Sequence, residues 1–165
     1  MDKIRMEEIR ELLFYLKENY VMFFGKKSLH DLMEFIGGYI HCMDKRDGDI
    51  MMFLPGFGEY VAEYHDIRSQ PWPKVLEFFS IYEETAFDSF FELLDKFWKE
   101  KKHELGFDYP IAISYTEYEA YLKKRHGTRS YGGVEYVEIV RETEEEIFEN
   151  TDLNDFIKER YGHSN

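Results

Sequence analysis

Cysteine and long apolar runs are scarce in this chain, and their scarcity excludes several classes of protein. Cys42 is the one cysteine among 165 residues, so neither an internal disulfide nor a multi-cysteine metal site can form. No apolar run reaches the ~18–20 residues of a membrane span. The N-terminus interleaves charged with apolar residues, so we expect no signal peptide. These features predict a cytoplasmic protein in which Cys42, set in an apolar helical pattern, is a buried structural thiol.

Basic charge is also scarce. The chain carries 21 lysines and arginines against 34 aspartates and glutamates, a net charge of −13. A surface of this sign repels phosphate groups, so we expect no direct binding to nucleic acid or to a membrane. A basic protein partner suits it, because opposite potentials speed encounter and fix orientation. Solubility alone is an equally good explanation of the charge.

The motifs of common catalytic and metal sites are missing as well. The six histidines belong to no HExxH motif and to no Cys/His cluster, and the chain has no GxSxG or GxGxxG. Glu59, Glu63 and His65 come closest to a ligand set, but Glu63 and His65 would face different sides of a helix. We therefore predict a protein that is not an enzyme, with no cofactor and no metal site.

Aromatic residues, in contrast, are abundant, at 18% of the chain. In the stretch 78–102, apolar residues recur at the spacing of one helical face, namely Ala86, Phe87, Phe90, Phe91, Leu94, Phe97 and Trp98. Ser80 with Glu83 resembles a capping box, although Thr85 could also start the helix. We predict a central helix over residues 83–102 that is buried along this face.

Other helical patterns cover most of the first hundred residues. Apolar spacing predicts helices over residues 3–19, 29–43, 57–67 and 74–82. Ser28 is the candidate N-cap of the second of these helices. The Gly37-Gly38 pair inside it predicts a close crossing with another helix, because glycine otherwise weakens a helix. We expect Val21–Phe24 to be an apolar link and Trp72 to lie over the core as a lid.

The last third mixes strand and helix patterns. Residues 109–115 suit an edge strand or an extended link, and residues 134–140 alternate as a strand does. Between them, Thr116 is the candidate N-cap of a helix over 117–126, with Gly127 in the position that ends helices. We expect a loop over residues 128–133, and one or two helices in the tail from Glu142.

These patterns together predict an α+β fold that is mainly α-helical, with a small β element in the C-terminal third. Residues 50–54 fit either a short strand or the entry to the next helix. The length suits a single compact domain over residues 1–165. Within it we distinguish a helical core over 1–102 and an acidic α/β extension over 103–165.

The strongest asymmetry of charge lies at the C-terminal end. Residues 131–165 hold ten acidic and three basic residues, a net charge of −7 in about a fifth of the chain. We predict that a basic partner binds here, through the residues Tyr131, Glu135, Tyr136, Glu138, Glu142, Glu145, Glu146 and Glu149. The two tyrosines would supply aromatic anchors and the glutamates the charge. The alternative is that these acids only solvate a helix and an edge strand.

Two segments of the first hundred residues carry a resemblance to a known group. The run Gly25-Lys26-Lys27-Ser28-Leu29, followed by Phe35-Ile36-Gly37-Gly38-Tyr39, resembles small bacterial proteins that are similar to the immunity partners encoded beside secreted toxins. Trp72, Phe78-Phe79-Ser80 and Ala86-Phe87 with Phe90-Phe91 fit the same pattern. The resemblance spans roughly residues 1–100 and implies an immunity-type inhibitor that neutralises a basic toxin domain. A structural or adaptor protein, or an enzyme of unrecognised type, are the alternatives.

Overall fold

The computed structural model describes residues 3–43, 51–138 and 151–162. These ranges form eight helices, α1 (Lys3–Glu18), α2 (Tyr20–Phe24), α3 (Leu29–Met43), α4 (Phe57–His65), α5 (Trp72–Phe78), α6 (Glu83–Leu105), α7 (Tyr115–His126) and α8 (Thr151–Tyr161). They also form four short strands, β1 (Met51–Phe53), β2 (Ala112–Ser114), β3 (Thr128–Tyr131) and β4 (Val134–Val137). The predicted class, a mainly helical α+β domain with a small β element, is confirmed.

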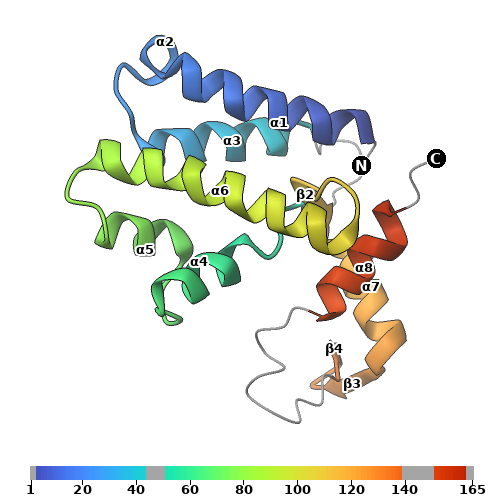
Figure 1. The fold of residues 1–165 in the computed structure, drawn as a ribbon. Helices are drawn as coiled ribbons and strands as arrows, with labels where there is room; N and C mark the ends of the chain where they lie inside the picture. Colours follow the sequence, from blue (N-terminus) through green and yellow to red (C-terminus); the bar gives the residue numbers. More distant parts are fainter. Residues whose placement is uncertain (1–2, 44–50, 139–150, 163–165) are drawn as a thin grey trace.

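Helix α6 lies at the centre of the molecule (Figure 1). Helices α1 and α3 lie on one side of it, and α4 and α5 on the other. Its aromatic face is buried as predicted, through Ala86, Phe87, Phe90, Phe91, Leu93, Leu94, Phe97 and Trp98. The half-buried Trp72 stacks on Phe90 with 5.4 Å between ring centroids, which confirms its place as a lid on the core. One continuous cluster of apolar side chains therefore organises the fold around α6.

The predicted start of α6 at Glu83 is confirmed, but both candidate caps are wrong. The helix begins at Glu83, and its N-cap is Tyr82, whose side chain makes no capping hydrogen bond. Neither Ser80 nor Thr85 is therefore the cap. The carbonyl of Tyr82 accepts from the amides of Thr85 and Ala86, so the backbone alone closes the first turn.

Helices α1 and α3 follow the sequence prediction closely. Ser28 caps α3, since its hydroxyl accepts from the amide of Asp31 at 3.2 Å. The link between these helices differs from the prediction, because Tyr20–Phe24 forms the short helix α2. Gly25 follows it with φ of +72°, a conformation that glycine adopts without strain.

Two expectations about α3 are wrong. A methyl group built on Gly37 or Gly38 meets no described atom within 4 Å, so no helix crosses α3 closely at this point. Both glycines lie on the exposed side of the helix, while Leu32, Ile36 and Ile40 face the core. Cys42, expected to be buried, is exposed near the end of the same helix.

The strand β1 settles the alternative left open for residues 50–54. It pairs with β2 in an antiparallel register that sets Met52 opposite Ile113. The amide of Leu54 extends the contact by donating to the carbonyl of Ile111 at 2.6 Å. This pairing joins the middle of the chain to its last third, and all three residues of β2 are buried.

Helix α7 is capped by Ser114 instead of Thr116. The Ser114 hydroxyl accepts from the amide of Glu117 at 3.0 Å. Gly127 ends the helix with φ of +84° as its position predicted, and its amide donates to the carbonyl of Lys123. Further along, Leu153, Phe156 and Ile157 of α8 are buried. No helix within the described ranges is long and apolar enough to cross a membrane.

Candidate protein-binding surfaces

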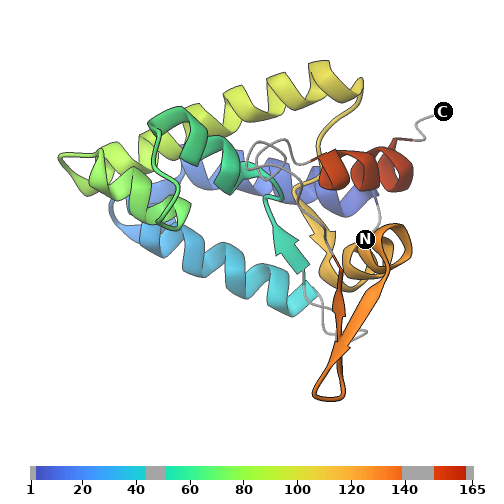
Figure 2. The same ribbon diagram turned by 90° about the horizontal axis from the view of Figure 1, so that it is seen from below.

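A β-hairpin projects from the body of the protein beside α7. Strands β3 and β4 pair in an antiparallel register that sets Tyr131 opposite Val134 (Figure 1). Gly132 and Gly133 join them, both with positive φ, as the commonest two-residue hairpin turn requires. The expected loop over residues 128–133 is therefore wrong, because its first four residues form β3. Figure 2 shows the hairpin extending away from the helices.

The register of the hairpin sorts its side chains onto two faces. Residues that are directly opposite each other share a face, and neighbours along a strand alternate. Tyr131 and Tyr136 therefore lie on one face, together with Val134 and Arg129. Glu135 lies on the other face, opposite Ser130. The hairpin thus has an aromatic face and a polar face, both largely open to solvent.

The aromatic face is exposed to an unusual degree for apolar side chains. Tyr131 is 82% exposed, Tyr136 54% and Val134 53%. An isolated two-stranded hairpin is only marginally stable in water, and these three side chains do not join the core. Large apolar groups held on a projecting element are the usual mark of a contact site for another molecule.

The structure brings together half of the residues predicted to bind a partner. Tyr131, Glu135 and Tyr136 lie on the hairpin, and Glu138 follows it directly. The amide of Glu138 donates to the carbonyl of Gly127 at 3.1 Å, which continues the ladder by one step and sets Glu138 in register with the aromatic face. The other predicted residues, Glu142, Glu145, Glu146 and Glu149, lie outside the described residues.

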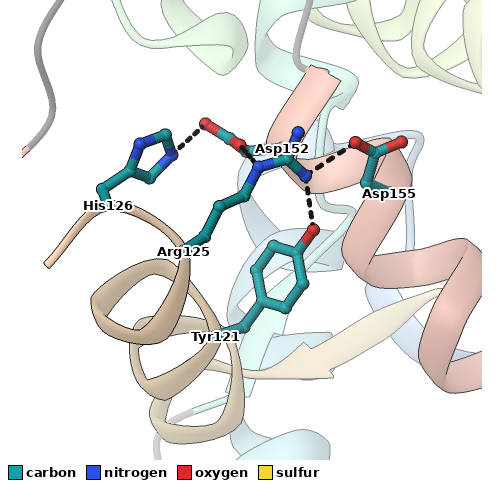
Figure 3. A network of polar contacts seen from close by, with 5 residues as sticks. All are labelled: Tyr121, Arg125, His126, Asp152 and Asp155. Carbon is teal, nitrogen blue, oxygen red and sulfur yellow. Dashed lines mark hydrogen bonds and ion pairs between the residues drawn. The ribbon is translucent and has the colours of Figure 1, made fainter.

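A polar network fixes the base of the hairpin (Figure 3). Arg125, in the last turn of α7, places Nε 3.1 Å from Asp152 and Nη1 2.7 Å from Asp155. The same Nη1 donates to the hydroxyl of Tyr121 at 2.6 Å. His126 Nε2 lies 3.0 Å from the second oxygen of Asp152. These contacts tie the end of α7 to the start of α8, one residue before β3 is reached.

The charges of this network match the dipoles of the two helices. Cationic groups are favoured at the C-terminus of α7, and Asp152 lies in the first turn of α8, where anions are favoured. The hydrogen bond that Arg125 donates to Asp155 is the main reason that the pKa of Arg125 is raised, so its charge is fixed. A His–Asp pair can serve acid–base chemistry. Here Asp152 is shared between Arg125 and His126, which suits a structural tie.

A second exposed apolar surface was not predicted. It consists of Phe78 at the end of α5, of Phe79, Ile81 and Tyr82 in the connection between α5 and α6, and of Tyr64 at the end of α4, which His65 links to Phe79. We call these five residues the α5–α6 patch. Phe78 is 77% exposed and Ile81 86%. The ring of Phe79 stacks on His65 with 4.3 Å between centroids, and His65 in turn packs against Tyr64.

The sequence does indicate this patch, but the helical spacing of its apolar residues led to a different interpretation. Residues 74–82 were assigned to one apolar helix, but α5 ends at Phe78. Four of the five residues from Phe78 to Tyr82 are apolar, which is more than one face of a helix can bury. The run itself therefore marks an exposed apolar segment.

Metal-binding side chains do not gather within the described ranges. No group of three or more His, Cys, Asp or Glu residues there could hold a metal ion. A groove of about 520 Å³ lies between α1 and α3, lined by Glu8, Glu11, Leu12, Tyr15 and Tyr39. Of its lining residues, Glu8, Glu11 and Tyr15 are themselves exposed, so the groove is open to solvent.

Comparisons with protein-family models, with curated proteins and with solved structures find no match for this chain.

Proposed function

We propose that the protein is an immunity-type inhibitor, which binds a basic toxin domain and neutralises it without catalysing a reaction. The observation that carries the proposal is the hairpin, whose aromatic face presents Tyr131, Val134 and Tyr136 to solvent. Its acidic neighbours Glu135 and Glu138 belong to residues 131–165, whose net charge is −7. Aromatic anchors surrounded by charge are the composition of a protein-binding surface.

The acidic and the aromatic side chains of the hairpin would contribute to different steps of binding. Acidic groups attract a cationic surface from a distance and raise the rate of association. Tyrosine rings then lose solvent against the partner and slow dissociation, because large rings bury much area with little loss of side-chain freedom. The network at Arg125 and Asp152 anchors the base of the hairpin, so that less ordering is needed on binding.

The test uses the product of the gene that lies next to this one. Expressed alone, that product is expected to arrest growth, and co-expression of this protein is expected to restore it. With purified proteins, the toxin activity should fall in proportion to added inhibitor and vanish at equal molar amounts. For a double variant, Tyr131→Ala with Tyr136→Ala, a larger molar amount of inhibitor should be needed to abolish the toxin activity.

An adaptor protein would give a different result in the same assay. It would bind the neighbouring product and leave its activity intact, whereas an unrelated protein would not bind at all. Either outcome contradicts the proposed inhibition. Tyr115→Ala, at a tyrosine of α7 that is 46% exposed, is the control and should neutralise as the unmodified protein does.

A further inference from the structure

The α5–α6 patch lies at a different end of the molecule from the hairpin. In Figure 1 the connection between α5 and α6 forms the left end, while β3 and β4 lie at the bottom right. Figure 2, turned by 90°, also separates them. The patch therefore cannot be part of the same contact surface as Tyr131 and Tyr136, and it needs an occupant of its own.

The patch is comparable in area to the largest apolar patch of a typical monomer, and such patches are often functional. Taking about 150–250 Å² for a whole aromatic side chain, the exposed fractions of its four aromatic residues amount to on the order of 500 Å², before Ile81 is added. The largest apolar patch on a typical monomer is about 300–600 Å². A standard interface buries about 800 Å² on each partner. The area thus reaches what one side of a small specific interface requires.

The backbone holds this apolar segment in place from both ends. At its start, the amide of Phe79 donates to the carbonyl of Val75, and that of Ser80 to the carbonyl of Glu77. At its end, the carbonyl of Tyr82 accepts two hydrogen bonds from the first turn of α6. The exposed rings are thereby presented on fixed backbone, which lowers the ordering cost of an association.

Two of the acids beside the patch are paired within the chain. Lys26 Nζ lies 2.7 Å from Glu83, at the start of α6, and Lys74 lies 2.8 Å from Glu77, near the end of α5. The hydrogen bond from Lys26 is the main reason that the pKa of Glu83 is lowered. Paired charges leave little net field to attract a strongly charged partner. They favour an occupant that is itself apolar at the contact and carries the same paired charges around it.

A second copy of the chain meets these requirements. A two-fold contact lays the same surface on both subunits, so apolar rings meet apolar rings. Helices α7 and α8 and the hairpin would lie at the outer ends of such a dimer, away from the contact. Charges separated by more than about 8–10 Å are largely screened at physiological salt. Repulsion between the two copies is therefore weak, and both hairpins stay free.

We propose that the α5–α6 patch is a self-association surface, through which two copies of this chain form a dimer by contact of Phe78, Phe79, Ile81 and Tyr82. Two copies of this four-residue contact bury at most on the order of 1,000 Å², at the lower end of specific interfaces. The dimer is thus expected to dissociate in the micromolar range. This inference uses a different surface from the proposed inhibition and does not depend on it.

The test is sedimentation velocity of the whole protein across the micromolar range, without any partner. The unmodified protein should shift from monomer to dimer as its concentration rises. Ile81→Glu, at a side chain that is 86% exposed, should stay monomeric and keep its helical circular dichroism, because the change touches no core contact. Raising the salt concentration should leave the dimer intact, since burial of apolar surface drives it.

Met22→Glu is the matched control. Met22 is 73% exposed on α2, in a different apolar region, so the variant adds the same charge to a comparable position. It should dimerise as the unmodified protein does. A protein that stays monomeric across the range, or a dimer lost in Met22→Glu and kept in Ile81→Glu, would overturn the proposal.

Discussion

Gly37 and Gly38 lie inside α3, and nothing in their described surroundings requires a residue without a side chain. A methyl group at either position meets no described atom within 4 Å, and both residues have ordinary helical backbone. Alanine stabilises an exposed helix position by about 1 kcal/mol relative to glycine. We expect Gly37→Ala to raise the free energy of unfolding by about that amount in a denaturant titration.

Gly106 supplies the control for this prediction. It also has open space around it, but its φ of +79° is a conformation that costs other residues about 1–2 kcal/mol. Gly106→Ala should therefore destabilise the protein, although its environment is as open as that of Gly37. If Gly106→Ala instead stabilises the protein as Gly37→Ala does, the positive φ of Gly106 does not carry the expected cost.

His65 offers a titration that reports on the α5–α6 patch. Its ring is stacked on Phe79, and burial lowers its pKa from the ordinary 6.5. A depressed pKa means that the unfolded chain takes up the proton first as the pH falls. The contribution of His65 to the free energy of unfolding is therefore fully present above pH 6.5, and it is lost as the pH falls from 6.5 through the folded-state pKa.

An NMR titration of the histidine ring protons measures this effect directly. We expect the His65 pKa to lie below 6.5 in the folded protein and to rise toward that value in Phe79→Ala, because the variant opens one side of the ring to water. A change at the neighbouring Phe78 should move it less. An unaltered His65 pKa in Phe79→Ala would show that the stacked ring does not desolvate it.

Among the elements, α6 carries most of the core. Phe91 is only 2% exposed on its buried face, whereas Phe78, a residue of the same type, is 77% exposed at the end of α5. Phe91→Ala should cost about 3–5 kcal/mol through lost burial and the cavity left behind. Phe78→Ala should change the free energy of unfolding by no more than about 0.5 kcal/mol.

A denaturant titration at low protein concentration, where self-association is negligible, compares the two variants. A loss below about 1 kcal/mol for Phe91→Ala would mean that the aromatic face of α6 is not the organising core. A large loss for Phe78→Ala would mean that the α5–α6 patch belongs to the core of the monomer.

Elements with a local cause could be predicted from the sequence. The buried face of α6 follows from the spacing of its apolar residues, and α3 from its cap at Ser28. Caps elsewhere were misplaced, because α6 begins without any side-chain cap and α7 has two hydroxyl residues, Ser114 and Thr116, near its start. Ser114 caps α7 in place of Thr116 because β2 ends at Ser114 and the helix follows directly. The position of β2 is in turn fixed by its pairing with the distant strand β1.

Elements with a non-local cause could not be predicted from the sequence. The residues of β3, Thr-Arg-Ser-Tyr, have no alternation of apolar and polar types and become a strand only through pairing with β4. The candidate site shows the same division. Tyr131 and Tyr136 could be singled out as aromatic residues in an acidic region, but their common face required the register. The exposure of Phe78 to Tyr82 depended on where α5 ends.

At the scale of the whole molecule, the hairpin end and the apolar α5–α6 end are separate surfaces built on one core. The two proposals assign them different partners, a basic protein and a second copy of the chain. Variants at one surface should therefore leave the other activity unchanged. Ile81→Glu should still neutralise the toxin, and Tyr131→Ala should still dimerise.

The central claim is that the hairpin binds a basic protein, and association kinetics with the neighbouring gene's product test it most directly. Glu135→Lys with Glu138→Lys should lower the association rate constant by about tenfold at low salt and by less at high salt. Glu18→Lys with Glu92→Lys, on exposed positions of α1 and α6, makes the same change in net charge and should have a small effect. If the hairpin variant associates as fast as the control at low salt, with the same dependence on salt, the hairpin is not the binding surface.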